Sequence, residues 1–282
     1  MELEIASQLI KLGSDFVITV FGVMTIMINN TINKPIPIKI FGRQPVFEAL
    51  RFGCVLQNIW IAKQAKDKPI RQIEETAQKK LVKVNYVDKN DIQKIVGAVV
   101  HQGVAAQVVY DNFIDIASLD SFIGHCNNPF ILVLDQIQDP HNLGAIIRTA
   151  EITNADLVIL PVKGSAPINA TVAKTSAGAL FGVKIHQTEN ITLLIKQLQQ
   201  HGIFVFAASV SNRQSIYQVD FTNPTALVIG SEDKGIRKNI QTVCDELITI
   251  PQLGKLNSLN ASVSTAIIMY EVIRQRYFKN IN

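Results

Sequence analysis

The chain has 282 residues, of which 48% are hydrophobic and 18% are charged, and its formal net charge is +4. This composition allows a sizeable core and excludes a wholly disordered chain, and the length suits two domains. The cysteines are few, odd in number and without a CxxC pair, which argues against a disulfide framework or a zinc site and favours a reducing, cytoplasmic compartment.

Positive charge is concentrated in one part of the chain. Residues 36–110 contain 12 basic and 6 acidic residues, whereas residues 1–35 contain 2 and 3, and residues 111–282 contain 13 and 14. Such a block is the electrostatic footprint of a module that contacts phosphates, although an ordinary Lys-rich surface would give the same count.

Residues 1–35 are predicted to be an N-terminal extension. The uncharged apolar run Phe16–Ile28 has 13 residues, fewer than the roughly 18 that a membrane-spanning helix needs. It also lacks the basic start and small-residue cleavage site of a signal peptide, so we expect neither a membrane anchor nor an export signal. The run is either an extra strand or foreign to the native protein, whose start would then be Met24 or Met27.

Alternating helix and strand patterns predict a small α/β domain over residues 36–111. Helices are expected within Phe41–Leu50 (after a turn), Arg71–Lys80 and Lys89–Val96, and strands at Asn58–Ala62, Val82–Val87 and Gly103–Tyr110. Residues 112–128 lack strong periodicity and are predicted to be a linker.

Residues 129–282 are predicted to form a second α/β domain. Its near-continuous apolar runs are typical of parallel strands covered on both faces. Strands are expected at Ile131–Asp135, Leu157–Pro161, Phe204–Ser209, Ala226–Gly230 and Leu247–Pro251. Helices are expected at Asn142–Glu151, Ala170–Ser176, Thr192–Gln200, Lys234–Val243 and Asn260–Phe278. The last helix has the clearest pattern, because apolar residues recur at spacings of three or four at Val263, Ile267, Tyr270 and Ile273.

Three loops after predicted strands are rich in Gly, Asn, Ser and Pro: residues 136–151, 229–236 and 251–262. In open α/β sheets, ligands bind at the carboxyl ends of the strands, so these loops form a candidate site for a polar organic cofactor. No cluster of His, Cys or carboxylates suggests a metal, and His101 and His141 are expected to have structural or surface roles. The absence of GxGxxG and Walker motifs argues against a nicotinamide enzyme or an NTPase.

The same loops carry a family resemblance. LDQIQDPHNLGAIIRTAE (134–151), LVIGSEDKGI (227–236) and IPQLGKLNSLNASVSTAIIMYE (250–271) resemble, in this order, motifs of the SpoU or TrmH branch of SPOUT RNA methyltransferases. VAKTSAGAL (172–180) resembles a further family segment. In the first domain, GRQPVFEAL (42–50) and HQGVAAQV (101–108) resemble the ribosomal-protein-like RNA-binding domain of two-domain members, such as the 23S rRNA (guanosine-2′-O-)-methyltransferases.

This resemblance implies a mostly parallel sheet whose C-terminal part is threaded into a trefoil knot, and a homodimer with the site beside the interface. It implies S-adenosylmethionine as cofactor, contacted by Gly230, Ile250 and Leu259, and catalytic surroundings formed by Asn142, Arg148, Glu232, Ser258 and Asn260. The sequence departs from the usual motif residues of the family at Gln252-Leu253, Asn257 and Ala261, but none of these differences removes a polar group that methyl transfer needs.

Methyl transfer to a ribose hydroxyl requires the enzyme to position that hydroxyl and to help it lose its proton. Glu232, Ser258 and Asn260 are suited to fixing its position by hydrogen bonds. Arg148 is the family's proposed base, but a guanidinium with a pKa above about 12 stays protonated. We therefore favour Arg148 as a clamp on a phosphate and leave the destination of the proton open.

The sequence favours a guanosine of large-subunit ribosomal RNA as the target, because of the two-domain layout. A transfer-RNA guanosine methyltransferase is the first alternative, although such members are usually shorter. An antibiotic-resistance enzyme that methylates adenosine in the same RNA shares the layout. A non-catalytic RNA-binding assembly factor is the alternative from another class, and the intact set of polar motif residues argues against it.

Overall fold

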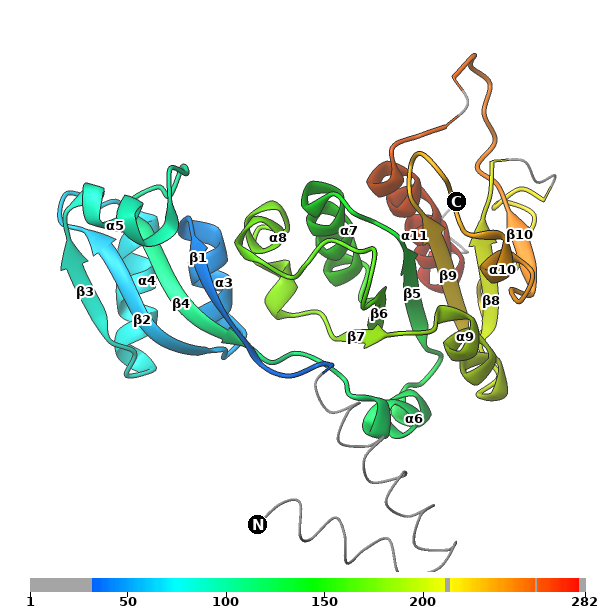
Figure 1. Ribbon diagram of the computed structural model, residues 1–282, viewed down its shortest axis with the longest axis horizontal. Coiled ribbons are helices and arrows are strands. Elements are labelled where there is room, and N and C mark those ends of the chain that lie inside the picture. The colour runs from blue at the N-terminus through cyan, green and yellow to red at the C-terminus, as the bar shows by residue number, and fades with distance from the viewer. Residues whose placement is uncertain (1–31, 211–213, 257, 279–282) are drawn as a thin grey trace, which may run out of the picture.

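The computed structural model describes residues 32–210, 214–256 and 258–278. The apolar run Phe16–Ile28 and the candidate starts Met24 and Met27 lie outside these residues. Two α/β domains follow one another along the chain (Figure 1). In the described part of the chain, no helix is both long and apolar enough to span a membrane.

The first domain contains a four-stranded sheet in the order β1-β4-β2-β3. β4 is antiparallel to β1 and β2, whereas β3 is parallel to β2. Alternate residues of these strands point to opposite layers. Ile59 and Ile61 join the core beneath α3 and α4, while Ala62 and Ala105 join a smaller cluster with Ile92 of α5. The elements are β1 (Ile36–Phe41), α3 (Arg43–Arg51), β2 (Val55–Ala62), α4 (Lys68–Lys79), β3 (Val84–Val87), α5 (Lys89–Val96) and β4 (Val104–Tyr110).

The second domain contains a six-stranded parallel sheet in the order β10-β8-β9-β5-β6-β7. Its strands are β5 (Phe130–Asp135), β6 (Leu157–Pro161), β7 (Ile185–Thr188), β8 (Phe204–Ala208), β9 (Thr225–Gly230) and β10 (Glu246–Ile248). Its helices are α6 (Ile116–His125), α7 (Pro140–Ile152), α8 (Ala170–Thr175), the 3₁₀ turn η1 (Ala179–Phe181), α9 (Ile191–Gln200), α10 (Lys238–Gln241) and α11 (Ala261–Tyr277).

The strands of this sheet are buried on both faces, as their apolar runs predicted. Ile131 and Val133 pack with the helices α6 and α9, whereas Leu132 and Leu134 pack with α7 and α11. All six residues of β5 are buried. The expected α/β class with a mostly parallel C-terminal sheet is therefore confirmed.

The structure differs from the sequence predictions at several elements. β1 was not predicted because Pro37 lies inside it, but β1 is an edge strand, where proline is tolerated. α6 occupies part of the segment that was predicted to be a linker without strong periodicity, and it buries only Leu119 and Ile123, which gives a weak pattern. β7 was also missed, because it has only four residues, and α10 is shorter than the predicted helix Lys234–Val243.

The two domains meet where α8 and η1 contact β1 and α3. Two glycines allow this approach: a Cβ atom at Gly178 would lie 2.6 Å from Cβ of Glu48, and one at Gly182 would lie 2.5 Å from Cζ of Phe52. Lys174 of α8 also donates a hydrogen bond to Oε1 of Gln102 in the first domain, at 3.1 Å. Residues 170–182 therefore hold the first domain against the second.

Candidate active site

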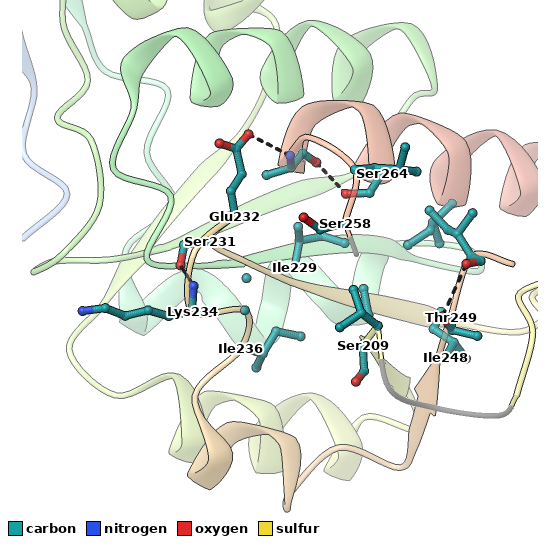
Figure 2. A pocket seen from close by; sticks show the side chains of 18 of the residues that line it. Ser209, Ile229, Ser231, Glu232, Lys234, Ile236, Ile248, Thr249, Ser258 and Ser264 are labelled. Atoms are coloured by element: carbon teal, nitrogen blue, oxygen red, sulfur yellow. Dashed lines mark hydrogen bonds between the residues drawn. The ribbon is translucent and has the colours of Figure 1, made fainter. Parts of the chain in front are cut away.

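The carboxyl ends of β5, β8, β9 and β10 lie at one edge of the sheet, and the loops that follow β8, β9 and β10 surround a cavity of about 400 Å³. Figure 2 shows Ser231, Glu232 and Lys234 on one wall, with Ser209 and Thr249 across the cavity. Gly230, Ile250, Ser258 and Leu259, all predicted site residues, line the same cavity. Apolar side chains from β9, β10 and α11 complete it: Ile229, Ile248 and Ile268.

Sequence reasoning missed the contribution of β8. Ala208, Ser209 and Val210 at its carboxyl end line the cavity. The strand itself was predicted, but the loop after it lacks the Gly- and Asn-rich composition that identified the other three. The available signal was topological, because β8 pairs with β9 in a parallel sheet and its end must reach the same edge.

Position 230 must be glycine because the backbone of Gly235 and Ile236 passes directly beside it. A Cβ atom at this position would lie 2.1 Å from the carbonyl carbon of Gly235 and 2.3 Å from the amide nitrogen of Ile236. The loop folds back on itself through a hydrogen bond from Gly235 N to the carbonyl oxygen of Ser231, at 2.9 Å. Gly230 therefore allows the loop to form one wall of the cavity with its backbone.

Asn142, Glu232 and Asn260, which are far apart in sequence, form one hydrogen-bonded cluster. Oε1 of Glu232 accepts from Nδ2 of Asn142 at 3.0 Å, from the backbone nitrogen of Ala261 at 3.0 Å, and from Nδ2 of Asn260. Asn260 also donates to Oδ1 of Asn142 at 3.0 Å, and its own Oδ1 caps α11 by accepting from the backbone nitrogen of Ser262 at 3.0 Å. The Glu232 carboxylate thus lies at the N-terminus of the 17-residue helix α11.

Glu232 also lines a second, smaller cavity of about 210 Å³. This cavity is bounded by Gln136, Gln138, Asp139 and Asn142, which belong to the loop after β5 and the first turn of α7. Residues 231–234 separate the two cavities, since they line both. A group bound on either side would therefore meet the same carboxylate.

The structure does not bring Arg148 into this cluster. It lies on an exposed part of α7, lines neither cavity, and makes no hydrogen bond or ion pair with any described residue. Six residues separate it from Asn142, which places it about 9 Å further along the helix and about 120° around the axis. The N-cap of α7 is Asp139, whose side chain accepts from the backbone nitrogen of His141 at 2.9 Å. Asn142 is thus not needed as a cap and is available to Glu232.

The cysteine thiols are not arranged for chemistry. Burial raises the pKa of Cys54 to about 11 and that of Cys244 to about 12, and burial also raises the pKa of Cys126. All three thiols are free and protonated at neutral pH. Across the residues that the structure describes, no three His, Cys, Asp or Glu side chains group so as to hold a metal ion.

Comparisons with known proteins agree with the two-domain architecture. Residues 129–270 match the SpoU rRNA Methylase family, and residues 39–112 match the domain described as RNA 2′-O ribose methyltransferase substrate binding. YacO of Bacillus subtilis, named for the TrmH family of tRNA/rRNA methyltransferases, is 35% identical over 238 residues, which are 84% of this chain and 95% of YacO. The 23S rRNA (guanosine-2′-O-)-methyltransferase RlmB of Haemophilus influenzae is 35% identical over 222 residues, which are 78% of this chain and 90% of that protein.

The fold also matches solved structures. The SpoU methyltransferase AviRb of Streptomyces viridochromogenes, crystallised with AdoMet, aligns with a TM-score of 0.70 at 22% identity, over 85% of this chain and 90% of AviRb. At this identity the match concerns the fold alone. The family resemblance that the three loop motifs carried is confirmed by the sequence comparisons. The chain belongs to the SpoU rRNA methylase family and is an S-adenosylmethionine-dependent RNA 2′-O-ribose methyltransferase.

Proposed function

We propose that the enzyme methylates the 2′-oxygen of a guanosine in 23S ribosomal RNA. The observation that carries the proposal is the position of Glu232 between two cavities, one large enough for the cofactor and one beside it for a nucleotide. The choice of ribosomal RNA is supported by the similarity to RlmB, which extends over both domains.

The larger cavity fits S-adenosylmethionine in size and chemistry. A volume of about 400 Å³ lies within the range of small-molecule sites, and apolar walls with a few hydroxyl and backbone groups suit a nucleoside. Gly230, Ile250 and Leu259 would hold it, mainly through their backbone, with Ser209 and Thr249 opposite. When bound, the cofactor supplies an activated methyl group.

The chain's own residues would then orient the ribose. Oε1 of Glu232 is occupied by three donors, so its second oxygen is the one that can accept a hydrogen bond from the 2′-hydroxyl. Ser258 lines the cofactor cavity, and Asn142 and Asn260 fix the carboxylate. Holding the hydroxyl in line with the methyl group supplies up to about 7–11 kcal/mol in well-oriented systems.

Arg148 acts on the RNA phosphate and is brought to the site by a second copy of the chain. Its distance from the Glu232 cluster within one chain supports this role. So does a stripe of exposed apolar residues on α11, in which Val263, Tyr270 and Tyr277 recur every seven residues and are 46–68% exposed. A helix stripe of this kind is typical of a surface that another protein covers. We therefore propose a homodimer built on α7 and α11.

Three further features belong to the same proposal. The chain runs from β10 at the sheet edge to α11, which packs against α7 and β9 near the middle, and this path supports a trefoil knot. The proposed domain boundaries are residues 36–111 and 129–282, joined by residues 112–128, whose helix α6 packs against the sheet of the second domain. The expected location is the cytoplasm, where ribosomal RNA is processed.

The test combines cofactor binding with methyl transfer. The purified protein should bind S-adenosylmethionine in calorimetry and transfer labelled methyl groups to an unmodified 23S rRNA transcript, and nuclease mapping should find one 2′-O-methylguanosine. Labelling of bulk tRNA alone would support the tRNA alternative and overturn the proposed substrate. Absence of cofactor binding would overturn the proposed use of the larger cavity.

A further inference from the structure

The first domain contains a third cleft, with a volume of about 770 Å³, that shares no residue with the two cavities of the second domain. It is formed by the start of α3, the loop after β2, the helix α5 and the turn before β4. These four segments bring together Arg43, Lys66, Lys89, His101 and Gln102.

The cleft has uncommitted positive charge. Arg43 forms an ion pair with Asp67, so the one carboxylate of the cleft is already neutralised. Lys66 and Lys89 are exposed, and their ammonium groups have no hydrogen bond or ion pair with any described residue. Two free ammonium groups at one hollow are suited to the phosphates of a nucleic acid.

The turn that forms one wall of the cleft is held in a conformation that is unfavourable for its residues. Gln102 has a φ of +55°, in the left-handed region, and is followed by Gly103 at +80°. Arg43 maintains the turn by donating from its backbone nitrogen to Oε1 of Gln102, at 3.2 Å, and from Nε to the Gln102 carbonyl oxygen, at 3.3 Å. Residues that are held in such unfavourable backbone conformations cluster at the binding sites of proteins. This wall of the cleft is therefore held in place by hydrogen bonds within the domain.

The same turn is connected to the active site. Oε1 of Gln102 also accepts from Nζ of Lys174, at 3.1 Å. The next residue, Thr175, donates from its hydroxyl to the carbonyl oxygen of Pro140, at 3.2 Å, two residues before Asn142. RNA bound in the cleft would thus have a defined position relative to the Glu232 cluster.

We propose that this cleft, rather than the basic surface of the first domain as a whole, binds the RNA substrate, and that it takes an unpaired segment of one or two nucleotides. Lys66 and Lys89 contact the phosphates, while the amides of Gln64 and Gln93 and the exposed side chain of Val100 contact the bases. A volume of about 770 Å³ accommodates one or two unpaired nucleotides, and we expect a duplex, which is wider and stiffer, to contact only the edge of the cleft. This inference rests on the proposed action on RNA.

Two double variants with equal charge loss test the cleft. Lys66→Ala/Lys89→Ala removes its free ammonium groups. Lys79→Ala/Lys83→Ala is the control, because these exposed lysines also lack side-chain partners and lie at the opposite end of α4, about 17 Å away. The probes are a mixed-sequence single-stranded RNA of about 20 nucleotides and its duplex, with binding measured at several salt concentrations.

We expect the cleft variant to bind the single strand at least 10-fold more weakly, with the slope of log K against log salt reduced by about 1.4, as for two lost phosphate contacts. The control should change affinity less than 3-fold, and duplex binding should respond equally to both variants. Equal losses on the single strand would overturn the proposal, because diffuse charge would then suffice. Calorimetry with S-adenosylmethionine and methyl transfer by the wild type report separately on the proposed function, which can fail without affecting this comparison.

Discussion

Replacing Asp135 by asparagine tests how the loop 231–236 is held in place. Asp135 ends β5 and is fully buried, and its carboxylate accepts from the backbone nitrogen of Arg237 at 2.9 Å and from Nε and Nη2 of the guanidinium at 2.9 and 2.8 Å. Asparagine keeps the size but places an amide donor against these donors. Breaking a fully buried ion pair costs about 3–5 kcal/mol. Because the Arg237 side chain is 43% exposed and can be hydrated, we expect Asp135→Asn to lower the free energy of unfolding by about 2–3 kcal/mol.

That loss corresponds to a fall in Tm of about 4–12 °C for a domain of this size. Arg237 directly follows the loop that lines both cavities, so affinity for S-adenosylmethionine should fall at least 10-fold. Glu271→Gln is a matched control, because it removes the charge of a buried carboxylate that Arg274 contacts at 2.8 Å on α11, away from the loop. It should lower Tm without weakening cofactor binding. If Asp135→Asn leaves Tm and cofactor affinity unchanged, or alters only Tm, the proposed anchoring of the loop by Asp135 is wrong.

Three other predictions concern the packing of α7 on α8, the contact between the linker and β7, and the role proposed for Arg148. In Gly144→Ala, the new Cβ would lie 1.8 Å from Oγ1 of Thr175 and would push α7 away from α8. We expect the free energy of unfolding, measured by denaturation, to fall by about 1–3 kcal/mol, and the second substitution Thr175→Ala to restore part of it. Burial lowers the pKa of His186 from its ordinary 6.5, and its Nδ1 lies 2.8 Å from the carbonyl oxygen of Ile114. Because the His186 imidazole binds a proton more readily in the unfolded chain, the free energy of unfolding should fall as pH drops below about 6.5. His186→Leu should make the free energy of unfolding depend less on pH between 7.5 and 5.5. An equal pH dependence in both proteins would contradict this role of His186. Arg148→Ala should keep cofactor affinity within a few-fold while turnover falls about 10², Arg148→Lys should rescue little, and Asn260→Ala should impair both quantities. Mixing Arg148→Ala with Glu232→Gln protein should restore activity if Arg148 acts across a dimer, and normal turnover of Arg148→Ala would refute its role.

The site residues divide clearly between what the sequence predicted and what it did not. Gly230, Ser258 and Leu259 were predicted from motif loops, and all three line one cavity. Their grouping could be anticipated because parallel strands release their loops at one edge. Local composition did not mark Ser209; only the position of its strand in the parallel sheet pointed to it.

The hydrogen-bond partners of the site residues also could not be predicted from the sequence. The motifs marked Asn142, Glu232 and Asn260 as polar residues of interest, but only the fold places two amides and a helix N-terminus on one carboxylate oxygen. The separation of Arg148 from Asn142 could have been anticipated, because both lie in the predicted helix Asn142–Glu151 and their spacing places them about 120° apart around its axis, although the motif resemblance grouped them in one site.

The last helix shows where local information ends. The recurrence of Val263 and Tyr270 predicted a helix over 260–278 and α11 covers 261–277, because apolar spacing reflects the 3.6-residue turn whatever the stripe faces. The stripe that packs on the domain core is a different one, formed by Ile268, Met269 and Val272, while Val263 and Tyr270 are 46% and 54% exposed. Sequence alone determined that this segment is helical and apolar on more than one side. Only the tertiary structure decided which side is buried within the chain, because that choice depends on where β9 and α7 lie. α7 precedes α11 by more than a hundred positions, and β9 is placed by its pairing with β5, in which Phe130 lies opposite Thr225; such long-range contacts leave no local pattern in the sequence.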